Sequence, residues 1–145
     1  MTQIENFLTQ DEQDKIIEAI RKAEQNTSGE IRVHIEKDPR QEVLDRATEV
    51  FEILKMENTQ QRNAVLIYIA IDTRELVILG DVGINDVVPP HFWESTHQAI
   101  IKQFKEGNHT QGLVNGILTA GHQLKKHFPY KKGKANELPD DISFG

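Results

Sequence analysis

Hydrophobic and polar positions change period several times along the chain, and these changes predict alternating helices and strands. Apolar residues recur at helical spacing after Thr9, in residues 41–55, after Pro90 and in residues 110–128. Strict alternation over Glu30–Glu36 instead predicts a half-buried strand whose charged side chains face away from the core. The first half of the chain therefore reads as helix, strand, helix.

A continuous apolar run at residues 64–71 predicts a strand that is buried on both faces. The polar turn that follows leads to another strand at residues 75–79, which we expect to pair antiparallel with it. Residues 80–86 are rich in glycine, aspartate and asparagine, and we expect a loop there. The first two strands and the helix between them form a βαβ unit, so these two strands should be parallel. The fold class is therefore α/β, with a small mixed sheet covered by helices and with Leu66 and Ile67 in its core.

The length of 145 residues fits one domain, and we assign residues 1–129 to it. Residues 130–145 are basic first and acidic later, and we expect a tail with little regular structure. The N-terminus has no basic stretch followed by an apolar run, and the longest apolar run is far below the roughly 20 residues of a membrane span. We expect a cytoplasmic protein that does not enter a membrane.

The net charge and the lack of cysteine argue against several kinds of partner and active site. Lysine and arginine number 17 against 23 aspartates and glutamates, for a net charge of −6. Nucleic acids and anionic membranes both reward positive charge, so we expect neither as a partner. The absence of cysteine excludes a disulfide framework, a thiolate metal site and a cysteine nucleophile. We expect a monomer.

The familiar catalytic motifs are absent or incomplete. The chain has no glycine-rich phosphate loop with a lysine, no dinucleotide fingerprint and no serine elbow. Asp72 follows a buried strand, as the nucleophile of one phosphatase superfamily does, but Arg74 stands where that motif needs a second aspartate. A hairpin turn explains Asp72 better. The histidine pairs lack the i, i+4 spacing of a helical metal site, so we expect surface histidines.

Topology brings oxygen-bearing side chains together at one edge of the predicted sheet. The first and second strands begin there and the antiparallel third strand ends there. Oxygen ligands from several flexible segments suit Ca²⁺, with Mg²⁺ or another divalent cation as the alternative. The alternative is that these residues are solvated side chains in ordinary loops without a bound metal. The segment also fails the EF-hand pattern, because Gly83 stands where that pattern has an oxygen ligand. The candidate metal ligands are Glu30, Asn63, Gly80, Asp81, Asn85 and Asp86.

Five short segments in this order resemble the TPM domain family, in particular its short, single-domain bacterial members. They are TSGEIRV at 27–33, NAVLI at 63–67, GDVGI at 80–84, FKEGN at 104–108 and GLVNGI at 112–117. The resemblance extends over residues 9–128. It implies a Rossmann-like αβα sandwich that binds divalent metal, calcium in particular.

The resemblance also implies which residues bind the metal, and it is compatible with two functions. It carries the metal role to Glu30 and Asp81, matches Asn63 to the polar entry of the buried strand, and extends to Asn85 and Asp86 in a more variable loop. One function is a calcium-binding interaction module without turnover, acting on a protein partner that the sequence does not identify. The alternative is a metal-dependent acid phosphatase, in which Asp81 or Asp86 holds the ion that polarises a phosphoryl oxygen.

Overall fold

The computed structural model describes residues 7–130 and 136–145, and its elements follow the predicted order. Helix α1 begins with a capping box, in which the Thr9 hydroxyl accepts from the Glu12 backbone N–H and the Glu12 carboxylate accepts from the Thr9 N–H. The elements are α1 Gln10–Glu24, β1 Glu30–Glu36, α2 Val43–Ile53, β2 Ala64–Ala70, β3 Glu75–Gly80, α3 Val82–Asn85, α4 Glu94–Lys105, α5 His109–Lys125 and β4 Ser143–Phe144.

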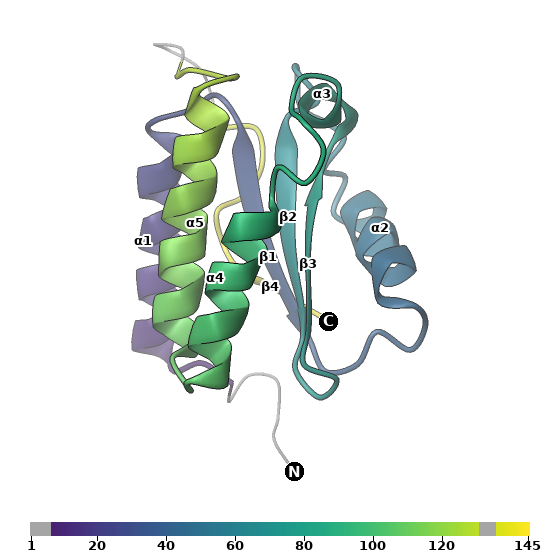
Figure 1. The fold of residues 1–145 in the computed structure, drawn as a ribbon, viewed down its shortest axis with the longest axis vertical. Coiled ribbons are helices and arrows are strands. Elements are labelled where there is room, and N and C mark those ends of the chain that lie inside the picture. The colour runs from purple at the N-terminus through teal and green to yellow at the C-terminus, as the bar shows by residue number, and fades with distance from the viewer. Residues whose placement is uncertain (1–6, 131–135) are drawn as a thin grey trace.

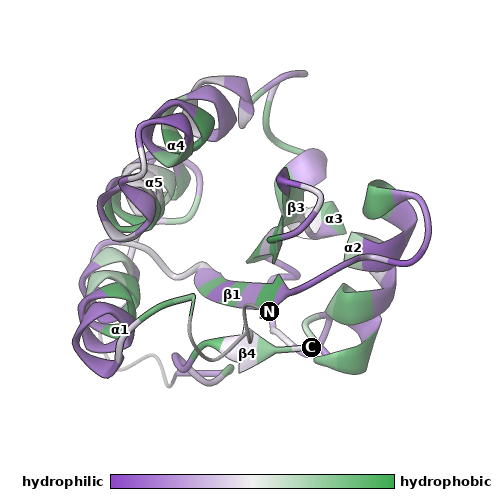
Figure 2. Cartoon of the chain, turned by 90° about the horizontal axis from the view of Figure 1, so that it is seen from below, coloured by the Kyte–Doolittle hydropathy of each residue, from purple (hydrophilic) through white to green (hydrophobic). Residues whose placement is uncertain are grey.

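The four strands form one mixed sheet in the order β3-β2-β1-β4. Strand β1 runs parallel to both β2 and β4, whereas β3 is antiparallel to β2. Helices α1, α4 and α5 lie on one side of the sheet and α2 lies on the other (Figure 1). The view from below shows the same three layers, with green, apolar stripes on the helices (Figure 2). The predicted α/β sandwich with a small, mostly parallel sheet is confirmed.

Strand β2 lies at the centre of the sheet and is buried along its whole length. Ile67 joins the core under α1, α4 and α5, and Leu66 joins the smaller core under α2. Both side chains are fully buried, as the apolar run at residues 64–71 predicts. None of the helices in the described ranges is long and apolar enough to cross a membrane.

Strand β1 departs from the sequence expectation. Its alternation predicts a charged face in solvent, but all seven residues are buried. Pairing in register with β2 turns Arg32 and His34 toward the α2 side, beside Leu66 and Tyr68. The prediction of a half-buried strand was therefore wrong, because protein covers both faces of β1.

The cover over this edge of the sheet comes partly from the C-terminal tail. Its regular structure within the described residues is the two-residue strand β4, which pairs with His34 and Ile35. Leu138 and Ile142 are buried, one in each core. The tail is therefore short of regular structure but docked on the domain, which its composition does not predict.

The segment Gly80–Asp86 is also more regular than the loop expected from its composition. Gly80 is the last residue of β3, and Asp81 caps the short helix α3. Ile84 is fully buried and anchors this turn to the core. The prediction of a loop was wrong here, because one apolar side chain and one capping carboxylate suffice to close a helical turn.

Candidate cation site at the sheet edge

Three segments that are distant in sequence meet where β1 and β2 begin and β3 ends, at the α3 end of the sheet (Figure 1). The Glu30 N–H donates to the Asn63 carbonyl at 3.3 Å, and the Asp81 N–H donates to the Ala64 carbonyl at 2.9 Å. Glu30 pairs with Ala64, and Gly80 pairs with Val65. The structure thus places Glu30, Asn63, Gly80 and Asp81 at one edge of the sheet.

Asp81 is a buried carboxylate held by an exposed arginine. Arg62 Nε donates to Asp81 Oδ2 at 2.7 Å and Arg62 Nη2 donates to Oδ1 at 2.9 Å, a bidentate pair. The side chain of Asp81 is 4% exposed and that of Arg62 is 47% exposed. Donation of hydrogen bonds to Asp81 raises the pKa of Arg62, so this guanidinium stays charged. The negative charge at this edge therefore has an internal counter-ion, which lies on the solvent side.

Asn63 is fully buried and only half satisfied. Its Nδ2 donates to Ser28 Oγ at 3.2 Å, and its backbone N–H donates to Thr59 Oγ1 at 3.2 Å. Within residues 7–130 and 136–145, no hydrogen-bond donor reaches its Oδ1. A buried amide oxygen without a donor costs free energy, so it marks a place where a further ligand could bind.

Glu30 already accepts hydrogen bonds from the tail. The N–H groups of Glu137 and Leu138 both donate to Glu30 Oε1 at 2.7 Å. The tail is thus fastened to one of the predicted metal ligands, and a cation bound near Glu30 would also sense the tail. Nothing in the sequence spacing of Glu30 and Glu137 indicates this contact.

The two remaining candidates lie further out. Asn85 Nδ2 donates to the Gly80 carbonyl at 3.1 Å, and Asp86 is the exposed C-cap of α3. Among the described residues, no group of three histidine, cysteine, aspartate or glutamate side chains could hold a metal by itself. A cation here would have to combine carboxylate oxygens with the Asn63 amide oxygen or backbone carbonyls, which is a donor set suited to Ca²⁺.

A further carboxyl group makes this end of the sheet more acidic than the sequence suggests. Glu24, at the end of α1, accepts the Ile31 N–H at 2.9 Å. Burial, the hydrogen bond with Asp140 and the nearby charge of Glu30 raise the pKa of Glu24 to about 10. Burial among other carboxyl groups disfavours the charged form of Glu24, so this carboxyl group keeps its proton at neutral pH.

Comparisons with known proteins decide the family. The sequence profile of the TPM domain matches residues 1–123. The chain belongs to the TPM domain family. The TPM domain's solved relatives include the BA42 protein from the psychrophilic bacteria Bizionia argentinensis, an NMR structure that is 56% identical, with a TM-score of 0.93 and full coverage of both chains. The comparison with curated proteins finds no match.

A more distant solved structure shares the fold of this TPM domain. It is the N-terminal domain of a protein from P. gingivalis, at 17% identity, with a TM-score of 0.71. The match covers 88% of this chain and 83% of that one. The family profile ends at residue 123, so the tail that holds Glu30 lies outside the part of the chain that the profile describes.

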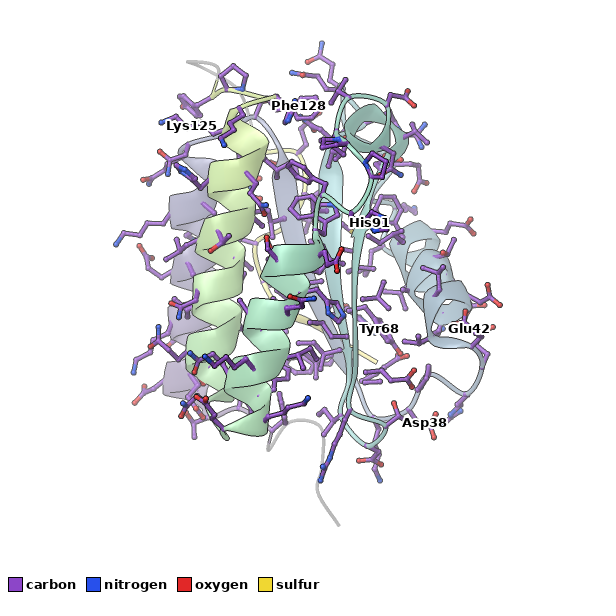
Figure 3. The ribbon with its side chains drawn as sticks, in the orientation of Figure 1. Asp38, Glu42, Tyr68, His91, Lys125 and Phe128 are labelled. Atoms are coloured by element: carbon purple, nitrogen blue, oxygen red, sulfur yellow. The ribbon has the colours of Figure 1, made fainter. Side chains whose placement is uncertain are left out.

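The opposite end of the sheet in this TPM domain carries a polar network that sequence reasoning missed. Glu36 accepts from Arg46 Nε at 2.8 Å and from Arg46 Nη2 at 2.9 Å, and also from the Tyr68 hydroxyl. Tyr68, labelled in Figure 3, belongs to the core between the sheet and α2. His34 Nε2 lies 3.0 Å from Glu36 Oε1, and its Nδ1 lies 2.9 Å from Ser143 Oγ. This network joins β1, β2, α2 and β4.

Proton affinities in this network follow from burial and hydrogen bonding. Burial by itself would raise the pKa of Glu36, but bonds from Arg46, Tyr68 and His34 outweigh it and lower the pKa to about 2. Burial lowers the pKa of His34, and the neighbouring Glu36 offsets that only partly. Burial and donation to Glu36 raise the pKa of Tyr68. At neutral pH the network holds a carboxylate, a guanidinium, a phenol and a neutral imidazole.

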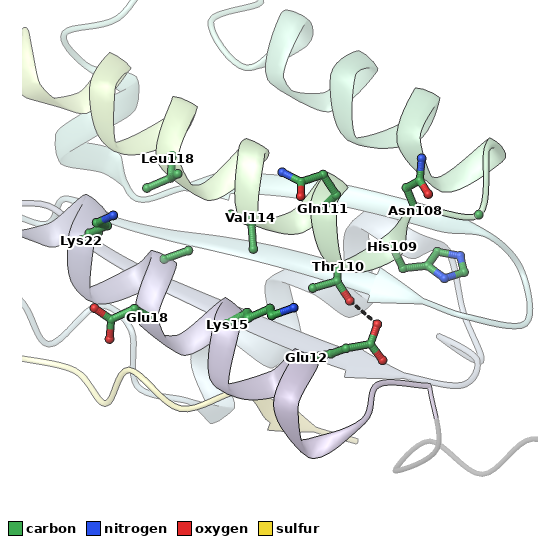
Figure 4. A pocket seen from close by; sticks show the side chains of 12 residues that line it. Glu12, Lys15, Glu18, Lys22, Asn108, His109, Thr110, Gln111, Val114 and Leu118 are labelled. Atoms are coloured by element: carbon green, nitrogen blue, oxygen red, sulfur yellow. Dashed lines mark hydrogen bonds between the residues drawn. The ribbon is translucent and has the colours of Figure 1, made fainter.

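Two surface hollows add little to these networks, although the second reaches Asn85 at the outer rim of the candidate site. One, of about 500 Å³, runs between α1 and α5, where the Thr110 hydroxyl donates to Glu12 Oε2 at 2.5 Å (Figure 4). Its Lys15 and Glu18 side chains have opposite charges, which gives no preference for a charged ligand. The other, of about 640 Å³, lies beside the segment that joins α3 to α4 and includes Asn85 and Trp93.

Proposed function

We propose that this TPM domain binds a divalent cation, calcium first, at the edge of the sheet where β1 and β2 begin. The observation that carries the proposal is the buried Asn63 Oδ1, which accepts no hydrogen bond from any of the described residues. Asn63 follows Arg62 of the Arg62–Asp81 pair in the chain, and its backbone carbonyl accepts a hydrogen bond from the Glu30 N–H. An unsatisfied neutral oxygen at the edge of the sheet that also carries Glu30 and Asp81 is better matched to a hard cation than to an anion or an apolar ligand.

The ligand chemistry of this edge supports the same assignment. Asn63 and Asp81 would supply an amide oxygen and a carboxylate, and Glu30 a second carboxylate whose Oε1 already accepts from the tail. Asn85 and Asp86 lie at the outer rim, where they would complete the shell together with water. Calcium tolerates such irregular, mixed ligands, whereas Mg²⁺ demands near-octahedral geometry.

The module acts, in this proposal, through a partner protein and without turnover. A bound cation would neutralise carboxylates at an edge where Glu30 holds the tail and Asp81 caps α3. Binding would therefore stiffen this edge and change its charge, and both changes can be sensed by a partner. The phosphatase alternative uses the same ion to polarise a phosphoryl oxygen.

A calcium titration followed by thermal unfolding and by NMR tests the proposal. A cation that binds only the folded state adds about 2.7 kcal/mol of stability at a hundredfold excess over its Kd. Calcium should raise the melting temperature and shift the side-chain amide signal of Asn63, and a chelator should reverse both. Glu30→Gln and Asp81→Asn should each blunt the response, because each removes a charge from this edge.

Asp72→Asn is the matched control, because it removes one carboxylate from the exposed β2–β3 turn at the other end of the sheet. An equal calcium response in all three variants would exclude this site. The same samples, assayed with a phosphate monoester with and without calcium, address the alternative. Turnover that requires calcium and disappears in Asp81→Ala would favour the phosphatase.

A further inference from the structure

We propose that Arg62 is a built-in competitor of the divalent cation: its guanidinium neutralises Asp81 when no cation is bound and must swing away for the cation to bind. This inference rests on the proposed function and adds a regulator to the same site. It concerns a residue that is not itself a ligand, because arginine has no acceptor atom for a metal.

The bidentate geometry makes the two cations mutually exclusive. Arg62 engages both oxygens of Asp81, and Oδ1 also accepts the Val82 N–H at 2.7 Å. A metal ion bound to either oxygen would stand within a few ångströms of a positive guanidinium, where like charges repel. Cation binding therefore requires the Arg62 side chain to leave the carboxylate.

Burial shows which partner can move. Asp81 is fixed, because its side chain is 4% exposed and caps α3, whereas the side chain of Arg62 is 47% exposed. The guanidinium can rotate into water without uncovering the core. An exposed arginine loses little by leaving a carboxylate, since water solvates it and other anions can pair with it.

The backbone beneath Arg62 is locked, so the movement is confined to the side chain. Arg62 has a left-handed φ of 51°, and its carbonyl accepts the Gly83 N–H at 2.9 Å. A Cβ at Gly83 would lie 2.1 Å from the Gln61 carbonyl oxygen and 2.5 Å from that of Arg62, so only glycine allows this close approach. The same turn holds Asn63, so one rigid segment carries both the competitor and the unsatisfied oxygen.

The competition sets the affinity for the cation. Because an arginine keeps its charge at any pH near neutrality, only displacement of the Arg62 side chain frees both oxygens of Asp81. The site would thus select divalent over monovalent cations. A divalent ion is attracted to the Asp81 carboxylate strongly enough to replace the guanidinium, whereas a monovalent ion of similar size is not. Loss of the arginine should tighten divalent binding and weaken this discrimination.

Calcium titration calorimetry on the full chain tests the inference with Arg62→Gln and Arg74→Gln. Arg74 is the matched control, because it also has a left-handed φ, of 56°, and lies in the turn at the other end of the sheet. Both variants lose one positive charge. We expect Arg62→Gln to bind calcium about threefold to tenfold more tightly than the natural chain, and Arg74→Gln to change the affinity less than twofold.

NMR of the Arg62 Nε–H provides a readout that does not depend on affinity. In the natural chain this signal should shift toward that of a free arginine as calcium is added. Arg62→Lys keeps the positive charge but cannot donate to both oxygens of Asp81 at once, so it should bind calcium with an affinity between those of the natural chain and Arg62→Gln. Weaker binding by Arg62→Gln, or equal tightening in Arg74→Gln, would overturn the competitor role while leaving the cation site intact. Calcium binding by none of these folded proteins would instead overturn the proposed function, and the inference with it.

Discussion

The two ends of the sheet each hold a bidentate arginine–carboxylate pair, and the two pairs have nearly the same bond lengths. At one end Arg62 binds Asp81 at 2.7 and 2.9 Å, and at the other Arg46 binds Glu36 at 2.8 and 2.9 Å. Glu36 also accepts from Tyr68 and lies beside His34, whereas Arg62 is the one cationic partner of Asp81 in the described part of the chain.

Surroundings, rather than bond geometry, separate the two pairs. Arg46 is 22% exposed and also pairs with Glu49, and its carboxylate partner joins four elements of the fold. Arg62 is 47% exposed, and its end of the sheet also holds the buried carboxyl group of Glu24, whose pKa is raised to about 10. The Arg46–Glu36 pair is a structural crosslink, whereas in our proposal Arg62 is an exchangeable counter-ion of Asp81.

The largest effect is expected from breaking the crosslink. Glu36→Ala should destabilise the protein by about 3–5 kcal/mol, because it leaves Arg46 and the Tyr68 hydroxyl without their buried acceptor. Chemical denaturation at neutral pH measures this. Glu49→Ala, which removes the exposed partner of Arg46, should cost about 0–1 kcal/mol. Similar costs for the two variants would contradict the distinction between the ends.

Protonation of Glu36 in acid should break its ion pair with Arg46 within a defined pH range. The pKa of Glu36 is about 2 in the folded protein against an ordinary value of 4.5, so its stabilisation is complete above about pH 4.5 and is lost as the pH falls toward 2. The stability difference between the natural chain and Glu36→Gln should therefore shrink by on the order of 3 kcal/mol between pH 5 and pH 2. A constant difference across this range would show that the folded carboxyl is not stabilised in its ionised form.

Glu24, at the acidic end, should behave in the opposite way. Its pKa is about 10, so the stability it contributes is complete below about pH 4.5 and declines as the pH rises toward 10. Glu24→Gln cannot ionise and keeps a donor for Asp140. It should exceed the natural chain in stability at pH 8 by on the order of 1–3 kcal/mol, and match it near pH 4. Unfolding curves at both pH values measure this, with the exposed Glu18→Gln as control.

The smallest effect on stability is expected at Arg62. Arg62→Gln without calcium should lower the melting temperature only slightly, because the Arg62 side chain is exposed, Asp81 keeps its hydrogen bond from the Val82 N–H, and Gly83 holds the backbone turn. Arg46→Gln should lower it clearly. If the two arginine variants melt alike, both pairs are crosslinks, and Arg62 is not a side chain that leaves at little cost.

Much of the fold could be predicted because its signals are local. The apolar run at residues 64–71 identifies the central strand, and the capping box at Thr9 and Glu12 identifies the start of α1. The βαβ rule and the hairpin then bring Glu30, Asn63, Gly80 and Asp81 to one edge. These inferences need only the order of the elements.

The electrostatic details of the candidate site could not be predicted in the same way. The sequence places Arg62 near the acidic residues but does not show that it engages both oxygens of Asp81. The alternation of β1 predicts a charged face in solvent, whereas Glu30 and Glu36 are buried by partners 107 and 10 residues away in the chain. Side-chain pairing over such separations leaves no periodic signal.

The sequence by itself determined the α/β class, the family, the central strand and the edge where Glu30, Asn63, Gly80 and Asp81 meet, because periodicity, capping and chain order are local or topological properties. The tertiary structure alone decided which charges are compensated. The tail pairs with β1 and donates hydrogen bonds to Glu30. The close packing of Gly83 on the 61–62 turn positions Arg62 beside Asp81. Compensation depends on distance and burial, which arise only when segments remote in sequence pack together.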